Sequence, residues 1–286
     1  MKIIDILKTH DKGVSFEFFP PKTAAGMNLL ISTVKALKEF KPLYTSMTYG
    51  AIGSSQSQTK EATYMLMGEK EFTVMPHLTC VGANVDTIKE LLSEYKKNGI
   101  KNIMALRGDP PLGTSALDFK NQALCYAKDL VKFIKSEDHF CIGVAVYPEG
   151  HIETKSLEED IEYTKQKIDM GANFAVTQMF FDNTYFYKFL ERADKKGIKI
   201  PVLPGIFPLT DIDKLKKFCS VARTTVPKKI EDEMSRFRNN PEDMEKAGID
   251  ITINQCRDLI RRGYKKLHFF TFNKANIIKV ILKGIA

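Results

Sequence analysis

The sequence has no long hydrophobic run, and this absence limits the classes of protein to which it can belong. No apolar stretch approaches the roughly 18 residues of a transmembrane helix, and the longest candidate, residues 200–209, is interrupted by three prolines and a glycine. Near the amino terminus, Asp5, Lys8, Asp11 and Lys12 occupy positions where a secretory signal peptide needs an apolar core. We therefore expect a cytoplasmic protein with no membrane partner.

Cysteine is scarce, and the usual signatures of metal and nucleotide sites are missing. The five cysteines are widely spaced without a CxxC pair, so we expect reduced packing residues and no disulfide framework. The five histidines lack metal-ligand spacing and no carboxylate cluster accompanies them, so no metal site is expected. Neither GxGxxG nor GxxxxGK(S/T) occurs, which excludes the Rossmann and P-loop devices for holding a nucleotide.

The charge balance is basic, with 43 Lys and Arg against 35 Asp and Glu and a net charge of +8. The basic residues are spread along the chain, and the densest stretches, residues 214–217 and 261–266, fit solvated helix faces and helix ends. A nucleic-acid partner is therefore not expected. A small polyanionic substrate is a second explanation for the same excess.

Eight short β-rich runs alternate with amphipathic stretches of helix length. The runs are residues 14–19, 43–48, 73–79, 102–107, 141–147, 174–180, 200–206 and 266–272. Three helical stretches end at Gly99, Gly171 and Gly197, which gives a repeat of about 30 residues, the size of a strand with its crossover helix. An open, doubly wound sheet would also fit such alternation, but eight units in 286 residues favour an α/β fold with a single (β/α)8 TIM barrel over residues 1–286. Two or three extra helices are expected between strands seven and eight, in residues 210–263.

Glu17 is the first candidate functional residue, because it ends the first predicted strand and barrel enzymes keep their chemistry at these strand ends. It shares one face of the strand with Ser15 and Phe19, and Phe16 and Phe18 lie on the other. Desolvation among phenylalanines is expected to raise the pKa of this carboxyl, as a general acid requires. A glutamate that faces water, or one paired with a lysine, is the plain alternative.

Polar residues also follow or interrupt other predicted strands. The sequence Arg107-Gly108-Asp109 follows the fourth strand, where the arginine could face an anion and the aspartate could accept paired donors from a heterocycle. A simple turn into the two prolines that follow would explain the same residues. His77 lies inside the third strand, where a lone histidine is more often a hydrogen-bonded core residue than a ligand. The aromatic run at residues 267–270 is interpreted as core.

Seven of these strand ends, in order, resemble methylenetetrahydrofolate reductase. They are FEFFPPKT at residues 16–23, TYG at 48–50, PHLT at 76–79, LRGD at 106–109, YPE at 147–149 with His151, TQMFFD at 177–182 and PGI at 204–206. Each motif is weak by itself, but their order along the chain is specific, and the length resembles the short bacterial form without a regulatory domain. The resemblance implies a (β/α)8 barrel that holds FAD non-covalently. It also implies a ping-pong reaction in which NADH or NADPH reduces the flavin and methylenetetrahydrofolate then becomes 5-methyltetrahydrofolate. A homo-oligomer is expected.

The resemblance also implies roles for individual residues. Glu17 matches the family's general acid, and Asp109 matches the aspartate near the flavin and the pterin. Positions similar to FAD contacts are Thr48, Tyr49, Ala51, His77, Arg107, Gly108, Asp109, Tyr126, Ala127, Tyr147, His151, Asp160 and Lys167. Positions similar to substrate contacts are Glu17, Gln178, Phe218 and Lys274.

The sequence departs from the family pattern at four positions, and three other functions are alternatives for it. Lys274 stands where an arginine is common, and a lysine keeps the charge but loses the bidentate fork. The other departures are Tyr163, Gln166 and Lys214. The rival functions are a lyase or aldolase with a Schiff-base lysine, for which Lys274 or Lys22 would be the nearest candidate, another flavin barrel of the proline-dehydrogenase type, and a non-enzymatic binding protein.

Overall fold

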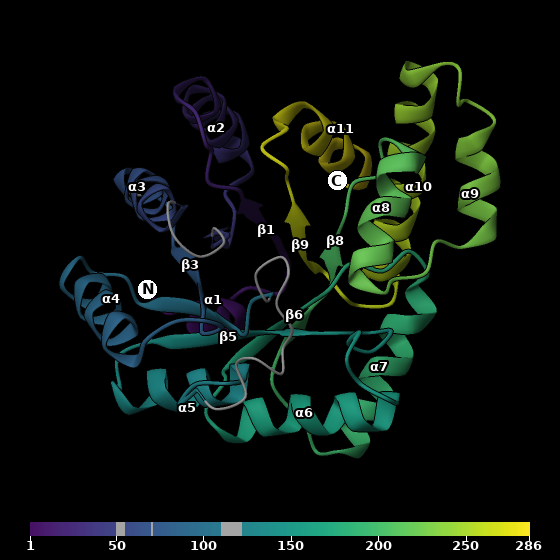
Figure 1. Cartoon of the computed structure of the whole chain (residues 1–286). Helices are drawn as coiled ribbons and strands as arrows, with labels where there is room; N and C mark the ends of the chain where they lie inside the picture. Colours follow the sequence, from purple (N-terminus) through teal and green to yellow (C-terminus); the bar gives the residue numbers. More distant parts are fainter. Residues whose placement is uncertain (50–54, 70, 110–121) are drawn as a thin grey trace.

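Nine parallel strands form one sheet in the order β7-β6-β5-β4-β3-β2-β1-β9-β8. The computed structural model describes residues 1–49, 55–69, 71–109 and 122–286, so the predicted site residue Ala51 lies outside the described residues. The strands are β1 (Gly13–Phe18), β2 (Tyr44–Met47), β3 (Val74–Thr79), β4 (Asn102–Leu106), β5 (Cys141–Val146), β6 (Phe174–Thr177), β7 (Val202–Leu203), β8 (Gly205–Ile206) and β9 (Lys266–Phe270). They curve into a nearly closed barrel with helices around it (Figure 1), which confirms the predicted (β/α)8 fold.

The predicted seventh strand, residues 200–206, is interrupted at Pro204 and forms two short strands. β7 pairs with β6, and β8 pairs with β9, so this stretch closes the ring. Pro204 has no N–H to donate, but its carbonyl accepts the N–H of His268 at 3.0 Å. The N–H of Gly205 donates to Thr177 Oγ1 at 2.8 Å, and a Cβ at this residue would lie 2.3 Å from the Thr177 carbonyl oxygen. Glycine is therefore required where β6 and β8 approach each other.

Helices connect the strands and cover the outside of the barrel (Figure 1). They are α1 (Ile3–Thr9), α2 (Ala24–Leu37), the 3-10 helix η1 (Lys38–Phe40), α3 (Ser55–Gly68), α4 (Val85–Lys97), α5 (Ala127–Ser136), α6 (Leu157–Asp169), α7 (Asn183–Lys195), α8 (Ile212–Ala222), α9 (Lys228–Ser235), α10 (Pro241–Arg261) and α11 (Ala275–Ile285). Three helices, α8 to α10, lie between β8 and β9, as predicted. In the described part of the chain, no helix combines the length and hydrophobicity of a membrane span.

The strands alternate between an outer face against the helices and an inner face inside the barrel. On β4 and β5, Ile103 and Ile142 belong to the outer core, which they share with residues of α4, α5 and α6. Met75, Met104 and Phe174 belong to a separate cluster in the interior. The barrel is therefore a packed core, as the inward-facing layers of such barrels usually are.

Helix α1 closes the amino-terminal end of the barrel. Ile3, Ile6 and Leu7 are buried against the interior cluster. Asn102, the first residue of β4, is 2% exposed and accepts the N–H of Ile3 at 2.7 Å through Oδ1, while its Nδ2 donates to the carbonyl of Met1 at 3.1 Å. The buried side-chain amide of Asn102 thus anchors α1, a helix that the strand pattern alone did not predict.

We expect Asn102→Ala to lower the free energy of unfolding by about 1–3 kcal/mol, because the buried N–H of Ile3 would lose its acceptor. Denaturant unfolding followed by circular dichroism measures this change. Asn254→Ala is the matched control, since Asn254 is exposed on α10, and it should stay within about 0.5 kcal/mol of the wild type. Equal stability of the two variants would show that Asn102 does not anchor α1.

Candidate active site

Glu17 lies on the inner face of β1, one residue before the end of the strand. The strand register places it opposite Ser46 of β2 and Phe270 of β9. Its backbone is fixed by Thr271, which follows β9 and donates to the Glu17 carbonyl through both Oγ1, at 2.6 Å, and its N–H, at 3.1 Å. The carboxylate is only 7% exposed, and a buried charge of this kind is costly without partners.

Two imidazoles supply those partners. The Nε2 atoms of His77, from β3, and His268, from β9, each lie 3.3 Å from Glu17 Oε2. Burial acts to raise the pKa of Glu17, but the charges and hydrogen bonds of the two imidazoles outweigh it and lower that pKa to about 2. The predicted rise of the pKa is therefore wrong. The phenylalanines are close to Glu17 in sequence, but the polar neighbours that decide the direction of its pKa shift come from other strands.

A second cluster lies between the carboxyl end of β5 and helix α6. The rings of Tyr147 and His151 meet edge to face with their centroids 4.7 Å apart. The backbone N–H of His151 donates to Asp160 Oδ1 at 3.0 Å. Lys167 is buried on α6, and its Nζ donates to the carbonyl of Ala145 at 2.6 Å and lies 5.7 Å from the Tyr147 ring centroid. The structure thus brings together four of the residues that were predicted to hold the cofactor.

Burial governs the ionisation of this second cluster. It lowers the pKa of Lys167 to about 8 despite the opposing charge of Asp160, and it raises the pKa of Asp160. The pKa of His151 is also lowered, first by burial and then by the charge of Arg107. With a pKa of about 8, Lys167 remains cationic at neutral pH. Lys167 and Arg107 therefore offer positive charge to an anionic ligand.

The Arg107-Gly108-Asp109 sequence follows β4 and borders this cluster. Arg107 forms a two-bond ion pair with Glu153, in which Nη2 donates to Oε1 at 2.9 Å, and this pair is the main cause of the raised pKa of Arg107. Asp109 is exposed, and its charge also acts on Arg107. Gly108 has a φ of +85°, and a Cβ there would lie 2.8 Å from the Cβ of Thr79. Only glycine therefore fits this turn without a shift of its neighbours.

Aromatic side chains form a wall near the ends of β1 and β9. Phe272 stacks on Phe19 with ring centroids 5.1 Å apart, and it also contacts Phe207 at 4.9 Å and Phe218 at 5.6 Å. Phe218, on α8, is 45% exposed. Lys274 is exposed two residues after Phe272, at the start of α11. These four phenylalanines, Phe19, Phe207, Phe218 and Phe272, which we call the aromatic wall, form an apolar cluster with a lysine following it in sequence.

Three other predicted residues lie at the ends of β2 and β6. The N–H of Thr48 donates to the carbonyl of Phe18 at 3.0 Å, which holds the end of β2 against β1. Tyr49 follows it and is half-buried, and burial raises its pKa. Gln178 comes directly after β6, and its Oε1 accepts the N–H of Met179 at 2.9 Å.

Tyr126 and Ala127 lie at the start of α5, and within the described residues no hydrogen bond or ion pair joins them to Glu17. Two of the departures from the family pattern lie on the neighbouring helix α6. The hydroxyl of Tyr163 donates to Glu159 Oε1 at 3.0 Å, and Gln166 Oε1 accepts from Lys128 Nζ at 2.9 Å. Both departures therefore have local partners on the surface of α5 and α6.

Two residues of the site were missed by sequence reasoning. His268 was interpreted as part of an aromatic core run, although period-two alternation separates it from Leu267 and Phe269, which belong to the outer core. A histidine on the inner face of a barrel strand was the available signal. Glu153, the partner of Arg107, gave no signal, because its position in a turn says nothing about the residue it will meet.

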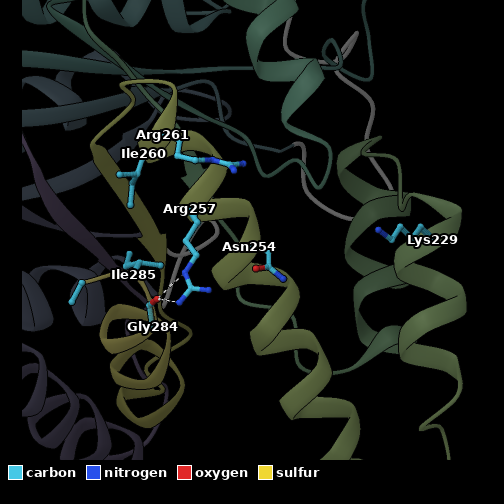
Figure 2. A pocket seen from close by; sticks show the side chains of 8 residues that line it. Lys229, Asn254, Arg257, Ile260, Arg261, Gly284 and Ile285 are labelled. Atoms are coloured by element: carbon cyan, nitrogen blue, oxygen red, sulfur yellow. Dashed lines mark hydrogen bonds between the residues drawn. The ribbon is translucent and has the colours of Figure 1, made fainter.

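A separate cavity of about 720 Å³ lies among α9, α10 and α11 (Figure 2). Its lining residues are Lys229, Asn254, Arg257, Ile260, Arg261, Gly284, Ile285 and Ala286. Arg257 donates through Nε and Nη2 to the carbonyl of Gly284, at 3.0 and 2.7 Å, and so ties α10 to the end of α11. None of the predicted site residues lines this cavity, and we assign it no part in the chemistry.

The fold and the two clusters define the class of protein. A parallel barrel with a buried carboxylate–imidazole group and a basic cluster near the carboxyl ends of its strands is a (β/α)8-barrel enzyme. The chain belongs to the methylenetetrahydrofolate reductase family, whose sequence profile matches residues 2–286.

Individual relatives agree with this assignment. The chain is 38% identical over 264 residues to the 5,10-methylenetetrahydrofolate reductase of Buchnera aphidicola, which covers 92% of this chain and 88% of that protein. It is 36% identical to the Pectobacterium carotovorum enzyme of the same name, over 92% of this chain and 87% of the relative. Methylenetetrahydrofolate reductase 1 of Schizosaccharomyces pombe is 34% identical over 95% of this chain, but the match covers only 45% of that longer protein.

Solved structures resemble the chain in fold. An uncharacterised protein from Clostridium thermocellum that binds two copies of 5-methyl-5,6,7,8-tetrahydrofolic acid aligns with a TM-score of 0.63 and 12% identity, over 98% of this chain and 96% of that one. Oxaloacetate acetylhydrolase aligns with a TM-score of 0.54 and 10% identity, over 99% and 83%. At such low identities these likenesses show the barrel fold alone.

The lowered pKa of Lys167 predicts how stability depends on pH. Between pH 8 and 10.5 the unfolded chain binds more protons at this lysine than the folded protein does. Burial of Lys167 therefore lowers the free energy of unfolding at pH 8 and below. This destabilisation disappears as the pH rises toward 10.5. We expect the stability of Lys167→Met relative to the wild type to fall as the pH rises through this window. Denaturant unfolding of the ligand-free protein at pH 8, 9 and 10 measures the difference, with Lys132→Met, an exposed position on α5, as control. A difference independent of pH would contradict the lowered pKa.

Proposed function

We propose that the protein reduces 5,10-methylenetetrahydrofolate to 5-methyltetrahydrofolate in a ping-pong reaction that uses FAD and NADH or NADPH. Membership of the family supports the overall reaction. The single observation that carries the residue-level proposal is Glu17, a carboxylate that is 7% exposed and held between two imidazoles at a strand end of the barrel. We take residues 1–286 to act as one catalytic unit.

The second cluster fits FAD by the chemistry of its donors. Arg107 and Lys167 would hold the pyrophosphate with His151, and Gly108 would allow the backbone of the turn to approach the cofactor closely. The remaining proposed contacts are Thr48, Tyr49, Ala51, His77, Asp109, Tyr126, Ala127, Tyr147 and Asp160. Bound there, FAD would supply the hydride-transfer chemistry between NAD(P)H and the folate. Binding of the anion would require Arg107 to exchange Glu153 for phosphate oxygens.

Glu17 would act as the proton donor to the folate. Methylenetetrahydrofolate must open its five-membered ring to a cationic iminium before it can accept a hydride, and the ring nitrogen that leaves needs a proton. Because the two imidazoles hold the pKa of Glu17 near 2, the carboxyl is ionised at neutral pH, and the proton would pass to it from one of these imidazoles before the carboxyl gives it to the leaving nitrogen. The negative charge of Asp109 would stabilise the iminium.

The remaining substrate contacts follow from shape and charge. The aromatic wall offers Phe218 to the flat rings of the folate, and Gln178 offers an amide at the end of β6. Lys274 would face a carboxylate of the glutamate tail. The Schiff-base alternative loses support, because Lys274 and Lys22 are both exposed, and an activated lysine needs desolvation or a cationic neighbour.

We expect purified protein to bind FAD, and denaturation to release it from the chain. Glu17→Gln should remain yellow and be reduced by NAD(P)H at a near-normal rate, but its reoxidation by methylenetetrahydrofolate should slow by about 10²–10⁴-fold, because glutamine has no acid proton. Stopped-flow absorbance separates the two half-reactions. Glu149→Gln is the matched control, a partly buried glutamate after β5 that accepts the N–H of Thr225. Normal reoxidation of Glu17→Gln, or equal losses in both halves, would exclude Glu17 as the acid.

We expect Lys274→Ala to raise KM for the folate roughly two- to fivefold, the range for losing an exposed ion pair, with little change in KM for the nicotinamide substrate. Lys274→Arg should preserve activity, because a guanidinium can hold the carboxylate through two bonds. Steady-state kinetics with each substrate varied in turn provides the test. If both constants rise together in Lys274→Ala, the lysine has a structural role.

A further inference from the structure

Arg223 follows α8 and joins it to the turn that leads from β5 into α6. Its Nη1 donates to the carbonyl of Ile152 at 3.1 Å and to that of Thr154 at 3.2 Å. The carbonyl of His151 is a third, longer neighbour at 3.5 Å. Among the described residues, no other hydrogen bond reaches the carbonyls of Ile152 and Thr154. The turn is therefore held from outside by an arginine at least 69 residues away in sequence.

The backbone of Arg223 indicates that its side chain is needed at this position. The residue ends α8 in the left-handed region, with a φ of +52° and a ψ of +43°. Glycine or asparagine is favoured at such a helix end, because a Cβ makes the conformation unfavourable. An arginine there carries a backbone cost, which its bonds to the turn offset.

The same turn fixes the imidazole of His151. The N–H of Glu153 donates to His151 Nδ1 at 3.2 Å, so Nδ1 is an acceptor and carries no hydrogen. Burial and the charge of Arg107 lower the pKa of His151, so the ring is neutral at neutral pH. Its one hydrogen then lies on Nε2, on the side of the ring away from Glu153. The backbone of the turn thus decides which nitrogen of His151 can donate to a ligand.

Binding of the cofactor would release one anchor of the turn. Glu153 pairs with Arg107, and the proposed FAD site needs Arg107 for phosphate oxygens. Arg223 bonds to backbone carbonyls, and a phosphate cannot replace it there, because a phosphate is itself an acceptor. We propose that Arg223 is a positioning residue for the cofactor, which holds the turn at residues 151–154 and so presents the Nε2–H of His151 to the bound anion. This inference rests on the proposed FAD site.

Two variants of Arg223 separate hydrogen bonding from backbone strain. Arg223→Gly suits the left-handed backbone and removes the donors, whereas Arg223→Lys keeps a cation with three N–H donors. We expect Arg223→Gly to raise the Kd for FAD about 3- to 10-fold, the range for losing hydrogen bonds from a charged but exposed group. Arg223→Lys should recover most of the affinity. Titration of the flavin-free protein with FAD, followed by flavin fluorescence, measures the Kd.

Stability and turnover distinguish positioning from a structural role. The melting temperature of Arg223→Gly should stay close to that of the wild type, because glycine relieves the strain, and kcat at saturating FAD should stay within about twofold. Arg238→Met is the matched control, since Arg238 bonds to α8 through Asp213 but not to the turn. An unchanged Kd in Arg223→Gly, an equal loss in Arg223→Lys, or an equal loss in Arg238→Met would overturn the proposal.

A second measurement needs neither cofactor nor turnover. Nitrogen-15 NMR of histidine-labelled protein at pH 8, with the His151 signal assigned by its loss in His151→Gln, should show a bare Nδ1 and a protonated Nε2. Arg223→Gly should shift this signal toward a mixture of the two tautomers. A wild-type His151 protonated at Nδ1 would overturn the proposal. Failure of the proposed function is distinguishable, because the wild type would then bind no FAD. If the wild type and Arg223→Gly bind FAD equally well, the positioning role alone is wrong.

Discussion

A carboxylate inside a packed barrel needs hydrogen-bond donors within reach, and this need organises the centre of the molecule. Glu17 lies at the edge of an interior filled by residues such as Met75 and Phe174. His268, from β9, forms a hydrogen bond with it, and His77, from β3, places its Nε2 3.3 Å from the same carboxylate oxygen. Since His268 is itself held by hydroxyls, a continuous series of polar contacts runs from the carboxylate into the barrel.

The two clusters of the site hold different ionisable groups, and these groups come from different strands. Imidazoles surround the carboxylate at β1, while lysine and arginine side chains gather around the ends of β4, β5 and α6. His77 lies between them, because it pairs with Met104 on β4, three residues before Arg107. It was predicted as a cofactor contact, and it also lies 3.3 Å from the proposed acid. His77 would therefore lie between the proposed cofactor and the proposed acid.

The sequence predicted what depends on local pattern. The alternating apolar runs predicted the strands. The glycines that were predicted to end α4, α6 and α7 all have positive φ, as such helix ends require. The break at Pro204 and the docking of α1 on Asn102 escaped prediction, because both depend on contacts between distant parts of the chain. The same reason explains the error on Glu17. Its residue type and strand position were readable from the sequence, but the direction of its pKa shift depends on His77 and on His268, the latter 251 residues away.

The pairing of β1 with β9 also has a kinetic consequence. It joins residues such as Glu17 and Phe270 from opposite ends of the chain. During synthesis, β1 therefore has one unpaired edge until Lys266–Phe270 has left the ribosome, and an unpaired parallel edge is a template for association with other chains. Closure of so long a loop makes ring formation a late and slow event. The time during which the edge of β1 stays unpaired therefore depends on how fast β9 is synthesised and pairs with it.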